Sequence, residues 1–433
     1  MTHQPAACLP SLGNISNLVV DHGTDFESLM PVSQRLADGK AVRVITLGGS
    51  VLYGNNCVRP TVEHHRACSW PARLVHALRL AYPAASITHD NLASGGNGVV
   101  HILSTLGIVL REHTDLILLD SLVNDAWRSG SVAASQALEA LVRTTRVLAP
   151  SAALLVVEAA APGLGDEVQR EKRKVLDHYR VATLDWKAAA GRNPSLWRPG
   201  PIPGTSATDI NHPSWETHQM VADALASHWS RAIRRSCRRE QAHAGPKLAD
   251  ANHRDASRAA DRWWPSVPLW SVEQLSKFDV CTAPLSVYTT AGGGTRVGVP
   301  SLSRGWRFFA DRPNKYGWIA EEAGARIGFE LRFGAAPRFC LTYLRSYEKV
   351  GRLEIAIPAT GFRAVIDALW ADRASQADVM WFGSTQGHDM TISYNTMYVP
   401  VKPNSTHVLE ATLIETPGRQ GGNKFKIIQL VSC

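Results

Sequence analysis

The chain of 433 residues lacks the features that mark several specialised classes of protein. It has no uninterrupted run of about 18 to 20 apolar residues, the length that a helix needs to cross a bilayer. The most apolar stretch, residues 147–161, is broken by Pro150 and Glu158 and is better interpreted as a core strand. The amino terminus has no basic segment followed by an apolar one, so no secretory signal is visible. Internal repeats and low-complexity tracts are also absent, which leaves an ordinary globular chain.

Cysteine is scarce and is not spaced as in a metal site. The seven cysteines form an odd set without a Cys-x-x-Cys pair, and no metal or other cofactor is predicted. Cys57 and Cys68 lie close together in a polar loop, and a disulfide between them would indicate an oxidising compartment. Asn14 and Asn404 begin Asn-x-Ser/Thr triplets that would accept glycans in a secretory or extracellular setting. Because no signal is visible, the compartment stays open.

Charge and composition indicate a folded chain rather than a disordered or nucleic-acid-binding one. The formal charge is +8 with 45% apolar residues, values typical of a folded protein. Five arginines crowd into residues 231–239, and such a cluster can bind nucleic acid or an anionic membrane. No aromatic or zinc-finger pattern accompanies them, so a solvated helix end that runs into a linker is the better interpretation. We predict no nucleic-acid partner, and the sequence leaves the oligomeric state open.

The first half of the chain alternates short apolar runs with segments of helical spacing. The spacing predicts strands at 42–47, 86–89, 116–119 and 153–157. Helices are predicted between and after them, at 70–81, 98–111, 135–148 and 214–231. Since parallel neighbours need crossover connections, this order predicts a parallel sheet covered by helices on both faces, a three-layer α/β/α sandwich.

The second half has a different pattern, in which apolar and polar residues alternate. Residues 326–333 alternate strictly, and shorter alternations follow at 339–343, 353–357 and 409–413. Many short strands separated by turns predict an antiparallel β-sandwich or jelly roll. We divide the chain into an N-terminal extension at 1–37, an α/β domain at 38–232, a linker at 233–262 and a β-sandwich domain at 263–433.

Some residues of the second half could bind a ligand. Four tryptophans could stack on sugar rings, with burial in the core as the alternative for most of them: Trp306, Trp318, Trp370 and Trp381. Arg345 and Glu348 come at the end of a predicted strand, where an ion pair or a ligand contact fits equally.

Polar side chains follow the predicted strands of the first half in an order that suits hydrolysis. Ser50 ends a Gly-Gly-Ser turn after the first strand, and Gly96 lies in a glycine turn after the second, without the spacing of a phosphate-binding loop. Asn124 follows the third strand, where its amide could donate to an oxyanion. Asp209 stands three residues before His212 in a proline-containing loop, so the carboxylate could orient an imidazole that accepts the serine proton. Taken alone, the segments of Ser50 and Asn124 are better explained as ordinary turns, and the glycine turn and the Asp209–His212 pair are explained equally well by a plain turn, a cap and an incidental histidine.

Together the four segments resemble the SGNH hydrolases, also called GDSL-type esterases. The resemblance covers about residues 40–230 and implies a flavodoxin-like sheet. It implies that Ser50 is the nucleophile, His212 the base and Asp209 the carboxylate that orients it. It also implies that the oxyanion is bound by Ser50, Gly96 and Asn124.

Two departures from the family pattern bear on the substrate. The family's Gly-Asp-Ser is here Gly48-Gly49-Ser50, and the glycine of its Gly-x-Asn-Asp is replaced by Leu122, which could narrow the pocket. The expected function is a serine esterase acting on O-acyl, foremost O-acetyl, esters of a carbohydrate or small alcohol through an acyl-serine intermediate. A catalytically inert carbohydrate-binding protein and an O-acyltransferase that uses the same serine are the alternatives. The acyl group, the alcohol and the role of the second domain stay open.

Overall fold

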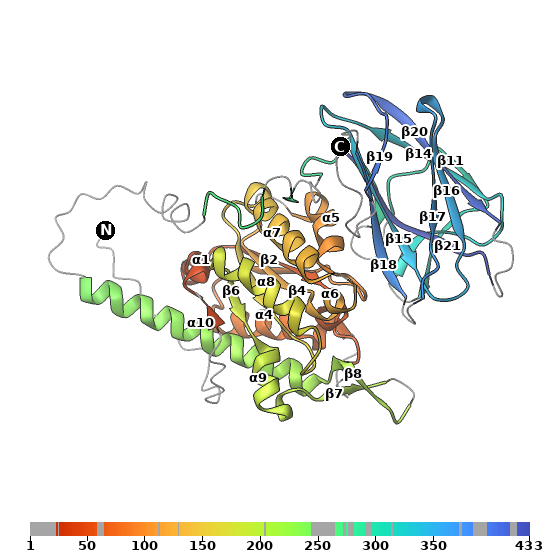
Figure 1. The fold of residues 1–433 in the computed structure, drawn as a ribbon. Helices are drawn as coiled ribbons and strands as arrows, with labels where there is room; N and C mark the ends of the chain where they lie inside the picture. The colour runs from red at the N-terminus through yellow and green to blue at the C-terminus, as the bar shows by residue number, and fades with distance from the viewer. Residues whose placement is uncertain are drawn as a thin grey trace. The chain divides into compact units, whose positions relative to one another are not determined.

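The computed structural model divides into two compact units, which are described separately (Figure 1). One comprises Met1–Val99 and Leu110–Leu275, and the other Val100–Val109 and Ser276–Cys433. The structure describes residues 23–24, 26–58, 65–110, 113–128, 130–202, 205–243, 265–271, 274–275, 281–290, 296–312, 315–371, 375–383, 396–415 and 422–433. Asn14 lies outside these residues. Among them, no helix has both the length and the apolar character needed to cross a membrane.

A mainly parallel sheet forms the centre of the first unit. Its strands are β1 (Gly23–Thr24), β2 (Val42–Gly48), β3 (Ile87–Asn91), β4 (Leu116–Asp120), β5 (Ala153–Val157) and β6 (Ala182–Leu184). Their order is β1-β6-β5-β4-β2-β3, with β1 antiparallel at one edge and the other strands parallel. Every residue of β4 and β5 is buried, which explains why these strands are continuous apolar runs. The order of the parallel strands is flavodoxin-like, as expected.

Helices cover both faces of this sheet, so the three-layer α/β/α prediction is confirmed (Figure 1). In chain order, the helices of the first half, including α5 between β3 and β4, are α1 (Met30–Ala37), α2 (Ser50–Tyr53), α3 (His65–Cys68), α4 (Trp70–Ala81), α5 (Val99–Val109), α6 (Leu122–Arg128), α7 (Ser131–Leu148), α8 (Asp166–His178), α9 (Trp186–Arg192) and α10 (Trp215–His243). Two 3-10 turns are also present, η1 (Phe26–Leu29) and η2 (Pro194–Leu196). α4 packs with α10, and α7 packs with α8 and α6. Right-handed crossovers place these two groups on opposite faces.

The ends of the first unit differ in detail from the sequence-based boundaries. β1, η1 and α1 precede residue 38, and β1 pairs with β6 in the central sheet. α10 continues to His243, past residue 232, because Ala232 and Ile233 extend its buried face. Further along the chain, the backbone N–H groups of Leu269 and Trp270 donate to the Glu139 carboxylate at 2.6 and 2.8 Å. These residues therefore pack on the α/β unit.

The second unit is the all-β domain that the alternation predicts. One sheet has the order β10-β9-β21-β15-β18-β19, with β13 paired to β21 and β12 paired to β13, and the other has the order β11-β14-β20-β16-β17. The strands are β9 (Ser286–Thr290), β10 (Arg296–Val297), β11 (Leu302–Arg304), β12 (Arg307–Arg312), β13 (Lys315–Ala320), β14 (Arg326–Arg332), β15 (Arg338–Arg345), β16 (Arg352–Ile357), β17 (Phe362–Asp367), β18 (Gln376–Gly383), β19 (Thr396–Tyr398), β20 (Thr406–Ile414) and β21 (Phe425–Ser432), with a 3-10 turn η4 (Pro358–Thr360). Inward residues of both sheets, including Phe329, Leu341 and Ile355, form one hydrophobic core.

Cys281 and Cys433, 152 residues apart, are joined by a disulfide that no spacing in the sequence predicts.

The tryptophans considered as sugar-stacking residues lie mostly inside this domain. Trp306 and Trp318 are buried in the core between the two sheets. Trp381 is also buried, but on the opposite face of β18, because Met380 and Phe382 on either side of it belong to that core. Trp370 is half-buried, and the Arg345 guanidinium lies 5.2 Å from its ring centroid. Arg345 pairs with Asp378 at 3.0 Å, whereas Glu348 is exposed. Of the two interpretations of Arg345, the structure favours the ion pair, with a partner other than Glu348.

Candidate active site

Ser50 lies at a sharp turn from strand to helix. β2 ends at Gly48, Gly49 has extended backbone angles (φ −90°, ψ −158°), and α2 begins at Ser50. A Cβ on Gly48 would lie 2.3 Å from the Asp120 carbonyl oxygen, so only glycine fits between β2 and β4. Ser50 is a buried residue, with 5% of its surface exposed.

His212 and Asp209 complete a chain of hydrogen bonds with this serine. The His212 Nε2 atom lies 2.7 Å from Ser50 Oγ, and Nδ1 lies 2.5 Å from Asp209 Oδ2. A carboxylate can only accept, so Nδ1 donates its proton to Asp209. Nε2 is then the acceptor for the Ser50 hydroxyl, which is the arrangement that proton abstraction from a serine requires.

The segment that carries Asp209 and His212 is a strand, which corrects the loop predicted from the sequence. β8 (Thr208–Pro213) pairs with β7 (Pro199–Pro201) in a two-stranded ribbon. The Trp197 Nε1–H donates to the Ile210 carbonyl at 2.9 Å and attaches the ribbon to the domain. Asp209 is paired with Gly200 and Pro213 with Pro199, and His212 lies in the bulge between these two pairs, so paired backbone on both sides holds the segment that carries the imidazole.

Asn124 meets the serine turn and the glycine turn at the carboxyl ends of the strands. Its Nδ2 donates to the Asn97 carbonyl at 3.1 Å, and a Cβ on Gly49 would lie only 1.9 Å from this nitrogen. Asn97 follows Gly96, which has a positive φ of 90°. The structure thus gathers the segments of Ser50, Gly96 and Asn124, whose roles as oxyanion donors remain predictions.

The residue after Asn124, Asp125, forms a buried ion pair with Lys172 that no sequence pattern indicated. The neighbouring Asp125 accepts from Val99 N–H at 2.7 Å through Oδ1, and through Oδ2 from the Ser121 hydroxyl at 2.8 Å and Lys172 Nζ at 2.6 Å. Lys172 and Asp125 are 2% and 0% exposed. Because breaking a buried pair leaves an uncompensated charge, this network fixes α6 and the glycine turn relative to each other.

His218 illustrates why a histidine near the site need not be the base. It is fully buried, its Nδ1 accepts from the Trp70 N–H at 3.2 Å, and burial lowers the pKa of its imidazole to about 3. His218 is therefore neutral and structural.

Among the described residues, no group of three or more His, Cys, Asp or Glu side chains could hold a metal ion.

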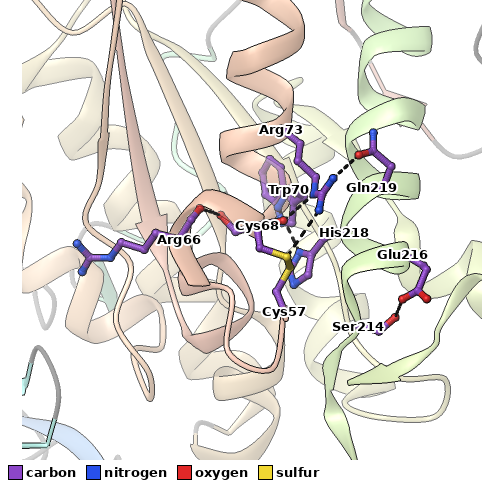
Figure 2. Close-up of a disulfide and its surroundings, with 10 residues drawn as sticks. Cys57, Arg66, Cys68, Trp70, Arg73, Ser214, Glu216, His218 and Gln219 are labelled. Carbon is purple, nitrogen blue, oxygen red and sulfur yellow. Dashed lines mark hydrogen bonds between the residues drawn. A yellow bond between two sulfur atoms is a disulfide. The ribbon is translucent and has the colours of Figure 1, made fainter. Parts of the chain in front are cut away.

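The turn after Ser50 is tied covalently to α3, the short helix that precedes α4. Cys57 and Cys68 form a disulfide with a Cα–Cα distance of 5.7 Å, and both residues are buried. Figure 2 shows Arg73 directed at Cys68 and Gln219; its Nε donates to the Cys68 carbonyl at 2.7 Å. The disulfide and this arginine join the serine turn, α4 and α10.

Asp120, at the end of β4, is a buried carboxyl close to the site. Its Oδ1 accepts from the Leu122 N–H at 3.2 Å, whereas Oδ2 has no hydrogen-bond partner among the described residues. Burial raises the pKa of this carboxyl well above its usual range. Leu122, which stands where the SGNH motif has glycine, is itself only 1% exposed.

Replacing Asp120 by asparagine is expected to raise the melting temperature at neutral and alkaline pH. A raised folded-state pKa means that the native state binds the proton more tightly, so stability is lost as pH rises above the unfolded value of about 3.9. The asparagine side chain keeps an oxygen that can accept from Leu122 and carries no charge. We expect an increase of about 2 to 4 °C at pH 8 that shrinks toward pH 4, measured by thermal unfolding. D223N, a half-exposed control on α10, should show no such trend, and an unchanged or lower D120N melting temperature at pH 8 would contradict the interpretation.

Comparisons with known proteins bear mainly on the fold. No family model matches the chain, and no curated protein is similar to it in sequence. Two crystal structures of a two-domain esterase (CEX) active on acetylated mannans, one of them co-crystallised with mannopentaose, are 16% identical and have a TM-score of 0.57. The similarity covers 95% of this chain and 97% or 98% of those chains, and it shows a shared two-domain fold. The acetylxylan esterase Axe2 from Geobacillus stearothermophilus is 19% identical over 44% of this chain and 94% of its own, with a TM-score of 0.36.

Proposed function

We propose that the protein is a serine esterase of the SGNH type that removes O-acetyl groups from a carbohydrate. The observation that carries the proposal is the continuous chain of hydrogen bonds from Asp209 through His212 to Ser50, formed by segments 162 residues apart. The Asn124 amide beside the serine turn adds a donor where an oxyanion would develop.

The proposed reaction has two acyl-transfer steps. His212 Nε2 takes the Ser50 proton as Oγ attacks the acetyl carbonyl, and Asp209 stabilises the imidazolium. The negative charge on the carbonyl oxygen is met by the N–H groups of Ser50 and Gly96 and by the Asn124 amide. The C–O bond to the sugar then breaks, and His212 returns the proton to the departing hydroxyl. Water, deprotonated by the same imidazole, releases acetate and restores Ser50.

A sugar ester is the preferred substrate class because of the two-domain architecture. The structures that share the fold over nearly the whole chain are of an esterase active on acetylated mannans, which supports the same class of substrate here.

The test uses two substrates. Acetate release from an acetylated manno-oligosaccharide is followed by NMR, and 4-nitrophenolate release from 4-nitrophenyl acetate is followed by absorbance. We expect turnover of both, and covalent labelling by a fluorophosphonate probe that peptide mapping assigns to Ser50. Absence of both turnover and labelling would overturn the proposal, and glycan binding without hydrolysis would identify an inert binding protein. Preferential capture of the acetyl group by an added alcohol would identify a transferase.

Trp127 is expected to contact the sugar rather than the acetyl group. It lies three residues after Asn124 on α6, hence on a neighbouring part of the same helix surface, and it is 61% exposed. Loss of a ring-stacking contact of about 1 kcal/mol raises KM about fivefold. We therefore expect W127A to raise KM for the acetylated oligosaccharide about fivefold while leaving kinetics on 4-nitrophenyl acetate unchanged. Y347A, which removes an exposed aromatic residue of the β-domain, is the matched control; equal effects of W127A on both substrates would rule out a sugar contact.

A further inference from the structure

Asn56 contacts the same carboxylate oxygen that holds the imidazole. Its Nδ2 lies 3.3 Å from Asp209 Oδ2, the atom that accepts from His212 Nδ1. The other oxygen, Oδ1, accepts from the Asn211 N–H at 2.9 Å. Both oxygens of Asp209 are therefore fixed. Within the described part of the chain, removal of Asn56 would leave Oδ2 with the bond to the imidazole alone.

The backbone around Asn56 explains how its amide reaches the carboxylate. Asn56 has a φ of 60°, a left-handed conformation that asparagine tolerates better than most residues. The preceding turn is built on the nucleophile itself, because the Ser50 carbonyl accepts from the N–H groups of Gly54 and Asn55 at 3.1 and 3.0 Å. The orientation of Asn56 is therefore linked directly to that of Ser50.

The ribbon that carries Asp209 lies directly against this turn. A Cβ on Gly200 of β7 would lie 2.8 Å from the Asn56 Cβ and 2.9 Å from its carbonyl oxygen. Gly200 is paired with Asp209 across the ribbon. Backbone contact and the amide–carboxylate hydrogen bond thus hold the ribbon and the serine turn together at one place.

The disulfide is the covalent anchor of this contact. Cys57 is the next residue after Asn56, its N–H donates to the Gly54 carbonyl at 3.0 Å, and its sulfur is bonded to Cys68. At 2% and 0% exposure, both cysteines are inaccessible to bulky reagents. Among the described residues, no other disulfide joins the Asn56 turn to α3.

We propose that Asn56 is a positioning residue that fixes the Asp209 carboxylate, and that the Cys57–Cys68 disulfide holds Asn56 in place, an inference that rests on the proposed esterase function. With the amide present, the carboxylate keeps the orientation in which the His212 Nε2 atom faces Ser50. Without it, the carboxylate turns more freely and the imidazole spends less time aligned with the hydroxyl.

The experiment compares N56A with N55A, which removes the neighbouring side chain of the same turn. For N56A we expect kcat on 4-nitrophenyl acetate to fall about tenfold with KM nearly unchanged, and fluorophosphonate labelling of Ser50 to slow in parallel. N56D places a second carboxylate beside Asp209, so the acid limb of its kcat/KM profile should move to higher pH because the imidazolium is stabilised. N55A should match the wild type in all three measurements.

Double substitution tests the role of the disulfide. C57A/C68A should lose kcat to a similar extent, and adding N56A should lower it little further, because both changes release the same carboxylate. N56A kinetics equal to those of N55A, or a shift of KM alone, would overturn the role of Asn56. Fully additive losses would overturn the role of the disulfide. A wild-type protein without turnover would instead contradict the proposed function itself, which separates the two failures.

Discussion

Replacing His212 by alanine is expected to lower kcat/KM for 4-nitrophenyl acetate by about 10⁴ to 10⁶-fold. Without the imidazole, the Ser50 hydroxyl keeps its proton, and the hydrogen-bond chain from Asp209 ends before it reaches the nucleophile. Single-turnover and steady-state hydrolysis with the purified variant, compared with S50A, provide the measurement. The two variants act on one proton transfer, so H212A/S50A should be no slower than either alone.

The control for this experiment is H76A, which removes an exposed histidine of α4. It should retain wild-type activity and a wild-type melting temperature. Substantial activity in H212A would mean that another group takes the serine proton, and the assignment of the base would be withdrawn.

Adding a single methyl group at Gly49 is expected to lower kcat by about 10² to 10³-fold, the loss typical of one missing oxyanion donor. The added Cβ of G49A would lie 1.9 Å from Asn124 Nδ2, a separation that no real contact tolerates. The amide of Asn124 must therefore leave its place beside Ser50. N124A should lose activity to a similar extent, because it deletes the same donor.

The double variant distinguishes this mechanism from general damage to the turn. G49A/N124A removes the side chain that G49A collides with, so its kcat should lie within about threefold of N124A alone. G191A is the control, since a Cβ there meets no atom within 4 Å. Multiplicative losses in the double variant, or an unaffected G49A, would contradict the proposed placement of the amide.

Four of the six strands of the central sheet, and the helices next to them, could be predicted because they depend on local pattern, whereas β1 and β6 are too short to give one. Strands buried on both faces, such as β4 and β5, are continuous apolar runs, and α4 has clear helical spacing between Trp70 and Ala81. α8 was not anticipated, because its thirteen residues are mostly charged and one of its buried positions is Lys172. Burial of a lysine depends on Asp125, 47 residues earlier, and no local pattern reports such a partner.

The candidate site shows the same division between local and distant causes. Ser50, Asn124 and the Asp209–His212 pair lie near strand ends or in a recognisable spacing, so their side chains could be proposed from the sequence. The ribbon of β7 and β8 could not, because prolines at its ends and little apolar alternation disguise its strands. Asn56 gave no signal either, since its importance arises only from contact with Asp209, 153 residues later.

The presence of Gly49, where the SGNH motif has aspartate, also has a three-dimensional cause. In this structure the space that a side chain at residue 49 would need is occupied by the Asn124 amide. The departure from Gly-Asp-Ser therefore accompanies the position of Asn124.

The Cys281–Cys433 disulfide makes the β-domain a closed covalent ring, because it joins residues on either side of nearly all of its strands. A protease that cuts one surface loop of this ring leaves both fragments attached to each other. The nicked domain would keep its mass in a non-reducing gel and would separate into two bands only after a reductant is added. A single cleavage in a loop of the sandwich therefore separates no part of the domain from the rest until the disulfide is reduced.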